Sequence, residues 1–143
     1  MSPEPILLVA DDDALVRELI LTRLRLAGYQ PYGARDGRDA LARLRELKPQ
    51  GLILDINMPE VDGFGVLGAL RERGMTPALP VLVLTARHAA DDVRKAIQLG
   101  AKDYLAKPFT QDQLMARVGR LLRPSRVAPQ PQPTPRPAET LEI

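Results

Sequence analysis

The sequence predicts a doubly wound α/β fold, in which helices cover both faces of one parallel, five-stranded sheet. Short and almost wholly apolar runs, which are typical of strands buried on both faces, alternate five times with segments of helical periodicity. Polar residues directly follow four of these runs, at the ends where the strands of an open α/β sheet present ligand-binding groups. A sheet of order 2-1-3-4-5 is favoured, because right-handed crossovers leave few other topologies.

The first predicted strand is the apolar run Ile6–Ala10, which leads into three consecutive aspartates. A helix is expected from Asp13 to Ala27, with Gly28 as its stop signal. The expected apolar face of this helix consists of residues at three- and four-residue steps, namely Leu15, Leu19, Thr22 and Leu26. We expect that face to pack against the sheet.

The second strand is predicted over residues 29–34, at an edge of the sheet, because Pro31 has no main-chain N–H to donate. Asp36 is expected to cap the next helix, whose apolar residues are Ala40, Leu41, Leu44 and Leu47. The third strand, Gly51–Asp55, is apolar up to its final aspartate. A loop of turn-forming residues then leads to a helix over about residues 63–73.

The fourth strand is predicted over residues 81–84, with Thr85 directly after it. Asp91 or Asp92 is expected to start the helix that follows, and Gly100 to end it.

The fifth strand is predicted over residues 103–106, with Lys107 directly after it and before Pro108. Thr110 is expected to cap the last helix, whose apolar residues are Leu114, Val118, Leu121 and Leu122.

Composition is that of an ordinary globular protein. The chain has 143 residues, of which 45% are hydrophobic and 27% charged, enough for one domain with a core. A net charge of +2 and an aromatic content of 3% give no support to direct nucleic-acid binding by this chain. The absence of cysteine excludes disulfides and thiolate metal sites.

We predict a folded domain over residues 1–123, followed by a proline-rich tail or linker over residues 124–143. This last segment holds six of the fourteen prolines and is expected to be extended or disordered. The first residues lack the basic and apolar regions of a signal peptide, and no run approaches the roughly 20 apolar residues of a membrane span. A cytoplasmic protein without membrane contact is therefore expected.

The predicted topology brings several polar strand ends to one edge of the sheet. The first and third strands are neighbours in it, so Asp11 and Asp12 are expected beside Asp55. Clustered carboxylates repel one another unless a cation neutralises them, and a hard divalent ion such as Mg²⁺ prefers carboxylate oxygens. Thr85 and Lys107 would reach the same edge. A carboxylate nucleophile, a divalent ion and a lysine together indicate phosphoryl transfer.

Four motifs of the chain resemble the receiver domain of bacterial two-component response regulators. They lie in the family's order, each at a strand end, and the resemblance covers about residues 6–123. The matching stretches are Ile6-Leu7-Leu8-Val9-Ala10-Asp11-Asp12-Asp13, Asp55-Ile56-Asn57-Met58-Pro59-Glu60-Val61-Asp62-Gly63, Leu84-Thr85-Ala86 and Gly100-Ala101-Lys102-Asp103-Tyr104-Leu105-Ala106-Lys107-Pro108-Phe109. The resemblance implies a flavodoxin-like (βα)5 fold, which agrees with the strand order inferred above.

The resemblance also implies a role for each acidic residue. Asp55 would accept the phosphoryl group from a phosphohistidine. Asp12 would bind Mg²⁺ directly, with Asp11 assisting, often through water. Asp55 itself and the backbone carbonyl of Asn57 would complete the protein ligands of the ion.

Four further residues receive roles by the same resemblance. Lys107 and Thr85 would contact phosphoryl oxygens, and the small Ala86 beside them would leave the entrance open. Thr85 and Tyr104 would form the conformational switch, with Tyr104 turning inward when Thr85 moves. Family members usually have a cis peptide bond at the position that precedes Pro108.

The implied function is phosphorelay signalling, in which phosphorylation of Asp55 changes a protein-interaction surface. The implied partners are a sensor histidine kinase or a phosphotransfer protein and an unidentified downstream protein. A homodimer through the fourth helix, fifth strand and fifth helix is a further implied partner, although Lys102 stands where dimerising regulators usually carry an acidic residue. The chain would catalyse its own phosphorylation and dephosphorylation and would not be an enzyme for other substrates.

Two forms of output remain open from the sequence: a stand-alone receiver, and a receiver joined to a C-terminal DNA-binding domain. A metal-dependent phosphohydrolase of the haloacid-dehalogenase type is the competing class. Its nucleophile would lie in the Asp11-x-Asp13 motif, but no threonine follows at Leu15 and no insertion supplies a substrate pocket. A nucleotide-binding flavodoxin-like protein is not supported, because the chain has no glycine-rich phosphate loop.

Overall fold

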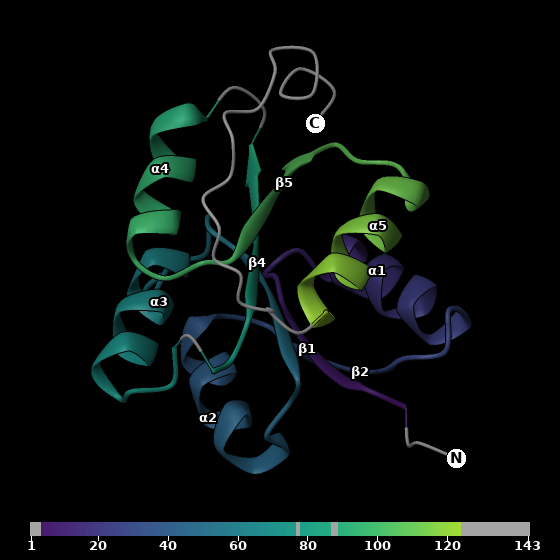
Figure 1. The fold of residues 1–143 in the computed structure, drawn as a ribbon, viewed down its shortest axis with the longest axis horizontal. Helices are drawn as coiled ribbons and strands as arrows, with labels where there is room; N and C mark the ends of the chain where they lie inside the picture. The colour runs from purple at the N-terminus through teal and green to yellow at the C-terminus, as the bar shows by residue number, and fades with distance from the viewer. Residues whose placement is uncertain (1–3, 77, 87–88, 124–143) are drawn as a thin grey trace.

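The computed structural model describes residues 4–76, 78–86 and 89–123. Five strands alternate with five helices in this part of the chain, and Figure 1 shows the strands as a central layer between the helices. In chain order the elements are β1 (Ile6–Ala10), α1 (Ala14–Leu26), β2 (Gln30–Ala34), α2 (Gly37–Leu47), β3 (Gly51–Asp55), α3 (Gly63–Glu72), β4 (Val81–Ala86), α4 (Ala90–Gln98), β5 (Asp103–Lys107) and α5 (Gln111–Leu122). The predicted tail, residues 124–143, lies outside the described residues.

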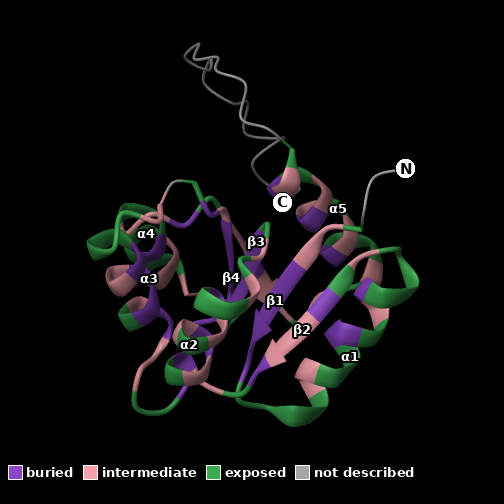
Figure 2. Ribbon diagram, turned by 90° about the horizontal axis from the view of Figure 1, so that it is seen from below, coloured by how far each residue is buried: buried purple, intermediate pink, exposed green. Residues whose placement is uncertain are grey.

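The strands form one parallel sheet of order β2-β1-β3-β4-β5, which confirms the predicted fold class and strand order. Alternate residues of each strand face opposite sides, so the sheet separates two hydrophobic clusters. One cluster joins the sheet to α2, α3 and α4, and the other joins it to α1 and α5. The inner strands are buried except for Ile6 at the start of β1 and Ala86 at the end of β4, because helices cover both of their faces, and Figure 2 shows this burial for β1.

Two strands extend further than the sequence predicts. β4 continues through Thr85 and Ala86, and β5 includes Lys107. The register pairs Thr85 with Ala106 and Ala86 with Lys107, so the polar ends of these strands still belong to the hydrogen-bonded sheet. The sheet therefore fixes the positions of Thr85 and Lys107 more firmly than a loop would.

The prediction of which face of α1 packs on the sheet is wrong. Leu15, Leu19 and Leu26 are 83%, 51% and 82% exposed, and Thr22 is exposed as well. The face that packs on the sheet consists instead of Ile20, Leu21 and Leu24. Apolar residues lie on two faces of this helix, so helical spacing alone does not tell which face is buried.

Side-chain caps begin three of these helices, and those at Asp36 and Thr110 are the predicted ones. Asp13 accepts hydrogen bonds from the first turn of α1, Asp36 caps α2, and Thr110 and Gln113 form a capping box on α5. Helix α4 differs from the prediction, since Ala89 is its N-cap and supplies no side-chain hydrogen bond. The aspartates predicted to start it lie in its first turn, where negative charge favours the positive end of the helix dipole.

None of the described helices is long and apolar enough to cross a lipid bilayer.

Candidate functional site

Three carboxylates meet at the carboxyl-terminal edge of the sheet. Strands β1 and β3 pair in register, with Ala10 opposite Leu54, so the residues after Ala10 arrive beside Asp55. Ligand oxygens of Asp11, Asp12 and Asp55 lie within 4.8 Å of one another. Asp11 and Asp55 are buried, whereas Asp12 is exposed, so the cluster opens to solvent on one side.

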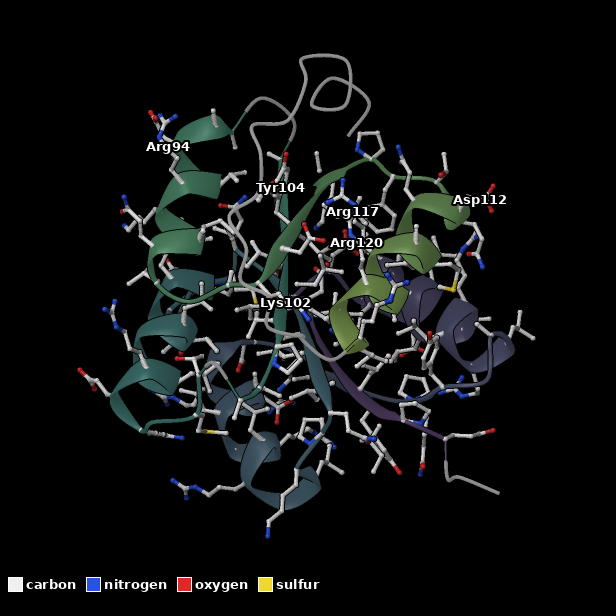
Figure 3. The ribbon with its side chains drawn as sticks, in the orientation of Figure 1. Arg94, Lys102, Tyr104, Asp112, Arg117 and Arg120 are labelled. Atoms are coloured by element: carbon white, nitrogen blue, oxygen red, sulfur yellow. The ribbon has the colours of Figure 1, made fainter. Side chains whose placement is uncertain are left out.

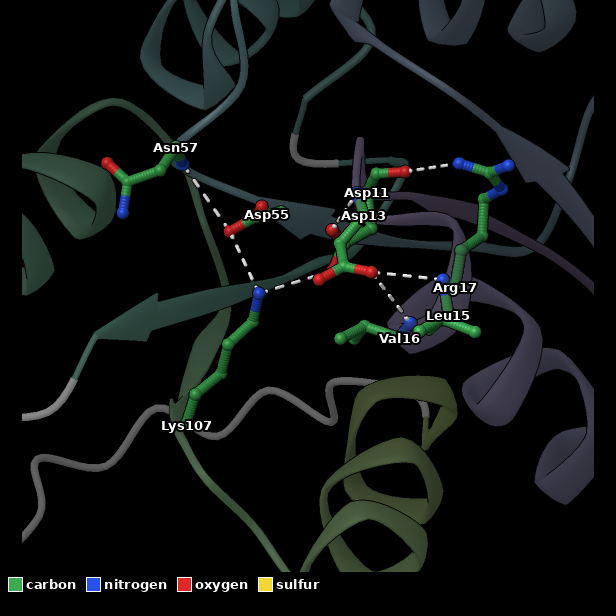
Figure 4. Close-up of polar contacts among 8 residues, drawn as sticks. All are labelled: Asp11, Asp13, Leu15, Val16, Arg17, Asp55, Asn57 and Lys107. Atoms are coloured by element: carbon green, nitrogen blue, oxygen red, sulfur yellow. Dashed lines mark hydrogen bonds and ion pairs between the residues drawn. The ribbon is translucent and has the colours of Figure 1, made fainter.

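Hydrogen bonds hold the loop between β1 and α1 at Asp11 and Asp13 (Figure 4). The N–H of Asp11 donates to the carbonyl of Ala34 at 3.1 Å, and the N–H of Asp13 donates to the Asp11 carboxylate at 3.0 Å. The Asp13 carboxylate in turn caps α1. Arg17, in the second turn of that helix, donates to the carbonyl of Asp11 at 2.7 Å. The acidic loop is therefore fixed from the neighbouring strand and from its own helix.

Lys107 supplies the cation nearest the cluster. Its ammonium Nζ lies 3.2 Å from Oδ2 of Asp11 and 3.4 Å from Oδ1 of Asp55, as Figure 4 shows. The side chain of Lys107 is 29% exposed, while those of the two aspartates are 0% and 5% exposed. The peptide bond from Lys107 to Pro108 is cis, as the family resemblance implied.

The electrostatics of the site favour a further cation. Burial, together with repulsion from Asp11, raises the pKa of Asp55 from 3.8 to about 6, although Lys107 and the N–H of Asn57 oppose the rise. Burial alone would lower the pKa of Lys107, but attraction to Asp55 and Asp11 outweighs it, so the pKa of Lys107 is raised. One ammonium does not compensate fully for two buried carboxylates and an exposed one.

The loop after β3 holds Asp55 from the other side. The N–H of Asn57 donates to Oδ1 of Asp55 at 3.3 Å, and the N–H of Gly63 donates to the carbonyl of Ile56 at 2.9 Å. A Cβ atom on Gly63 would lie 2.7 Å from Cα of Ile56 and 2.8 Å from the carbonyl oxygen of Asp55. Only glycine fits there, and this close approach turns the chain into α3 directly behind Asp55.

A hollow of about 440 Å³ opens over the cluster. The residues that line it are Asp11, Asp12, Asp13, Asp55, Asn57, Ala86, Lys107 and Pro108. The sequence-predicted site residues therefore come together here, with two exceptions. Thr85 is buried next to Ala86, and it lines an adjoining hollow of about 390 Å³ together with Tyr104. A hollow of about 580 Å³ at the amino-terminal ends of the strands is larger but contains no cluster of acidic groups among the described residues.

The fold and site together define an open α/β domain with a parallel sheet that carries three carboxylates and a lysine at its carboxyl edge. The family model described as "Response regulator receiver domain" matches residues 7–119. The chain therefore belongs to the response regulator receiver family of two-component signal transduction.

Curated relatives and solved structures agree with this family. The transcriptional regulatory protein PrrA of Mycobacterium leprae is 45% identical over 119 residues, which are 83% of this chain and 50% of PrrA. The DNA-binding regulator RpaA of Synechocystis is 40% identical over 88% of this chain and 52% of its own length. The chain thus spans about half the length of the curated relatives it matches.

Among solved structures, chemotaxis protein CheY4 of Vibrio cholerae superposes with a TM-score of 0.78 at 31% identity, covering 83% of this chain and 99% of CheY4. The receiver domain of Francisella response regulator 1452 gives a TM-score of 0.77 at 33% identity, covering 83% and 97%.

Receiver domains generally bind Mg²⁺, and the chemistry of the cluster fits that ion. All its ligand atoms are carboxylate oxygens, and the exposed position of Asp12 leaves room for the several waters that Mg²⁺ retains. Sequence reasoning missed one residue of this site, Arg17. Its position four residues after the helix cap Asp13 is the only signal in the sequence that it could reach back over the acidic loop.

Proposed function

We propose that this chain accepts a phosphoryl group on Asp55 in a Mg²⁺-dependent reaction and thereby changes a surface that other proteins bind. The observation that carries the proposal is the arrangement of Asp11, Asp12 and Lys107 around the carboxylate of Asp55. The donor would be a phosphohistidine of a sensor kinase or a phosphotransfer protein, as in the family to which the chain belongs. Turnover of other substrates is not part of the proposal.

The nucleophile is an oxygen of the Asp55 carboxylate. Its Oδ1 contacts Lys107 and the N–H of Asn57, and no hydrogen bond from the described residues reaches Oδ2. We assign the attack on phosphorus to Oδ2. A bond forms between Oδ2 and phosphorus while the P–N bond to the donor histidine breaks, and its electron pair returns to the imidazole ring. The product is an aspartyl phosphate.

The charges around Asp55 lower the barrier to this transfer. Lys107 lies where it can pair with an equatorial phosphoryl oxygen once the group is attached to Asp55. Asp11, Asp12, Asp55 and the main-chain carbonyl of Asn57 would hold Mg²⁺, which when bound offsets the negative charge of the phosphoryl oxygens. Ala86 has no side chain beyond Cβ, and it lines the hollow without blocking the donor's approach.

Thr85 and Tyr104 connect the site to the surface in this proposal. Thr85 is 2% exposed near the end of β4, one residue before Ala86 of the hollow, and in this proposal its hydroxyl would bind a phosphoryl oxygen. Movement of Thr85 would free space in the adjoining hollow that Tyr104 also lines. Phosphorylation would then shift a two-state equilibrium in which the ring of Tyr104 occupies different positions.

The output surface consists of α4, β5 and α5, which Figure 3 shows around Tyr104. The names of the curated relatives favour control of transcription, with DNA contact through a part of the protein beyond this chain; a stand-alone receiver that acts on a separate protein is the alternative. A second copy of the chain is one partner for this surface. Light scattering with and without acetyl phosphate tests that dimer, and an unchanged monomer would contradict it.

The proposed function is tested by incubating the protein with acetyl phosphate and Mg²⁺ and measuring its intact mass. We expect the wild type to gain one phosphoryl group, and Asp55→Asn and the wild type with chelator to gain none. Asp13→Asn is the matched control, because Asp13 caps α1 and contributes no ligand oxygen to the cluster. A wild type that stays unmodified with both acetyl phosphate and a phosphorylated histidine donor would refute the proposal.

A further inference from the structure

One arginine of α5 crosses the open edge of the sheet and contacts the proposed switch residue. Strand β5 is an edge strand, so main-chain groups on its outer side have no partner strand. Arg117 donates a hydrogen bond to the carbonyl of Tyr104, and its guanidinium carbon lies 5.5 Å from the centre of the Tyr104 ring. The labelled side chains in Figure 3 show Arg117 and Tyr104 together at this edge.

Asp103 completes the arrangement on the same edge. Its carboxylate accepts from the N–H of Tyr104 at 2.8 Å and from Arg117 at 3.0 Å. Both main-chain polar groups of Tyr104 are thus held by this aspartate–arginine pair. The side chains of Arg117 and Asp103 are only 11% and 18% exposed, so solvent screens their interaction less than that of an ordinary surface pair.

The neighbouring Arg120 has a different set of contacts. It pairs with the second oxygen of Asp103 at 3.2 Å, but its side chain is 50% exposed. The cation–aromatic contact of Tyr104 is with Arg117 and does not involve Arg120. The two arginines therefore share one helix and one aspartate, and they differ in contact with the tyrosine.

Tyr104 also lines a hollow on the α4 side of the sheet. The hollow of about 390 Å³ that Tyr104 lines includes Thr85, and its other lining residues are Val93, Arg94 and four alanines, namely Ala86, Ala89, Ala90 and Ala106. Tyr104 packs against the cluster on the α4 side of the sheet, whereas Arg117 comes from the α5 side. Tyr104 therefore contacts Arg117 of α5 and also lines the hollow that contains Thr85.

We propose that Arg117 is a positioning residue that holds Tyr104 at the sheet edge and so opposes its movement toward Thr85. This inference rests on the proposed switch. It names the residue that fixes the position of the Tyr104 ring before phosphorylation. Movement of the Tyr104 ring toward Thr85 would break its contact with the guanidinium of Arg117. The ion pair between Asp103 and Arg117 would stay in place. A cation–aromatic contact at a partly exposed site corresponds to about a two- to fivefold preference for the outer position.

The inference is tested on the full chain with all tyrosines replaced by 3-fluorotyrosine. Fluorine NMR of the three tyrosines, with Tyr104→Phe to assign the signal, reports the environment of the ring directly. We expect Arg117→Gln to shift the Tyr104 signal toward the position it takes with acetyl phosphate and Mg²⁺. Arg117→Lys, which keeps the charge, should restore part of the difference. Arg120→Gln removes the positive charge of the other arginine that pairs with Asp103, and it should leave the Tyr104 signal as in the wild type.

Thermodynamic linkage between the position of the Tyr104 ring and phosphorylation at Asp55 provides a second, quantitative readout. If the phosphorylated state favours the inner ring position, releasing the outer one must favour phosphorylation by the same factor. We expect Arg117→Gln to bind beryllofluoride, a phosphoryl-group analogue whose binding reaches equilibrium, up to about two- to fivefold more tightly than the wild type, and Arg120→Gln to match the wild type.

The two readouts separate failure of this inference from failure of the proposed function. A Tyr104 signal in Arg117→Gln that matches both the wild type and Arg120→Gln would overturn the role of Arg117, whether or not Asp55 is phosphorylated. If the wild type takes up no phosphoryl group, a different reference for the inner ring position is needed. The Tyr104 signal of Thr85→Ala then serves as that reference, because this substitution enlarges the hollow beside Tyr104. A shift toward it in Arg117→Gln would still support the positioning role while the phosphorylation proposal fails.

Discussion

Replacing Asp55 by asparagine is expected to stabilise the metal-free protein at neutral pH. Asparagine has nearly the shape of a protonated aspartate and carries no charge. At neutral pH the native Asp55 is ionised, yet it is buried beside Asp11, and for this reason its pKa is raised to about 6. The substitution removes a charge that the folded state tolerates poorly, so the free energy of unfolding should increase.

The magnitude follows from the shift in pKa. The value rises from 3.8 in the unfolded chain to about 6 in the folded one, and one pKa unit corresponds to roughly 1.4 kcal/mol. Ionised Asp55 therefore costs the folded state about 3 kcal/mol. Because the folded pKa is the higher one, the unfolded chain loses its proton first, and wild-type stability falls as the pH rises from about 4 to about 6. Above that range the cost stays constant.

Urea unfolding followed by far-UV circular dichroism measures this difference, since the chain contains no tryptophan for fluorescence. With chelator present, Asp55→Asn should exceed the wild type by about 3 kcal/mol at about pH 7.5, and by much less at about pH 4.5. Added Mg²⁺ should stabilise the wild type more than the variant, because the variant lacks one carboxylate ligand. Equal stability of the two proteins at about pH 7.5, or a gap that does not depend on pH, would refute the reasoning.

Three further predictions concern the same fold. Lys107→Ala should lower stability in chelator by about 1–3 kcal/mol, because it leaves two buried carboxylates without their cation, and Mg²⁺ should recover part of this loss in the same urea assay. Gly63→Ala should cost more than about 2 kcal/mol and slow phosphorylation by acetyl phosphate, because the added Cβ would clash with the main chain that places Asp55; an unchanged melting temperature would contradict this. Leu15→Gln should change stability by less than about 0.5 kcal/mol, whereas Leu24→Ala should cost about 2–5 kcal/mol, and similar losses in thermal unfolding would contradict the observed orientation of α1.

Much of the site was accessible to sequence reasoning because it depends on strand order. Once β1 and β3 are neighbours, the residues that follow Ala10 must arrive beside Asp55, and the structure places them there. The helix caps at Asp13, Asp36 and Thr110 could be predicted for a similar reason, since each depends only on residues within a few positions of it. Local chemistry and the period of the strands were sufficient for these features.

The orientation of α1 shows where such reasoning stops. Leu15, Leu19 and Leu26 follow helical spacing as well as the buried residues do, yet they face solvent. Which face is buried depends on the direction in which the crossover lays the helix on the sheet, and that is a property of the whole fold. The same limit applies to α4, whose first turn begins one residue earlier than the predicted acidic start.

The sequence by itself determined the alternation of strands and helices, the strand order and the set of polar residues at the carboxyl edge of the sheet. These follow from periodicity, from caps and from the limited number of right-handed topologies. Only the tertiary structure decided that Arg17 reaches back to the carbonyl of Asp11 and that Arg117 crosses the edge of β5 to Tyr104. Long arginine side chains adopt many conformations, and their partners are fixed only when separate elements of the chain are packed together.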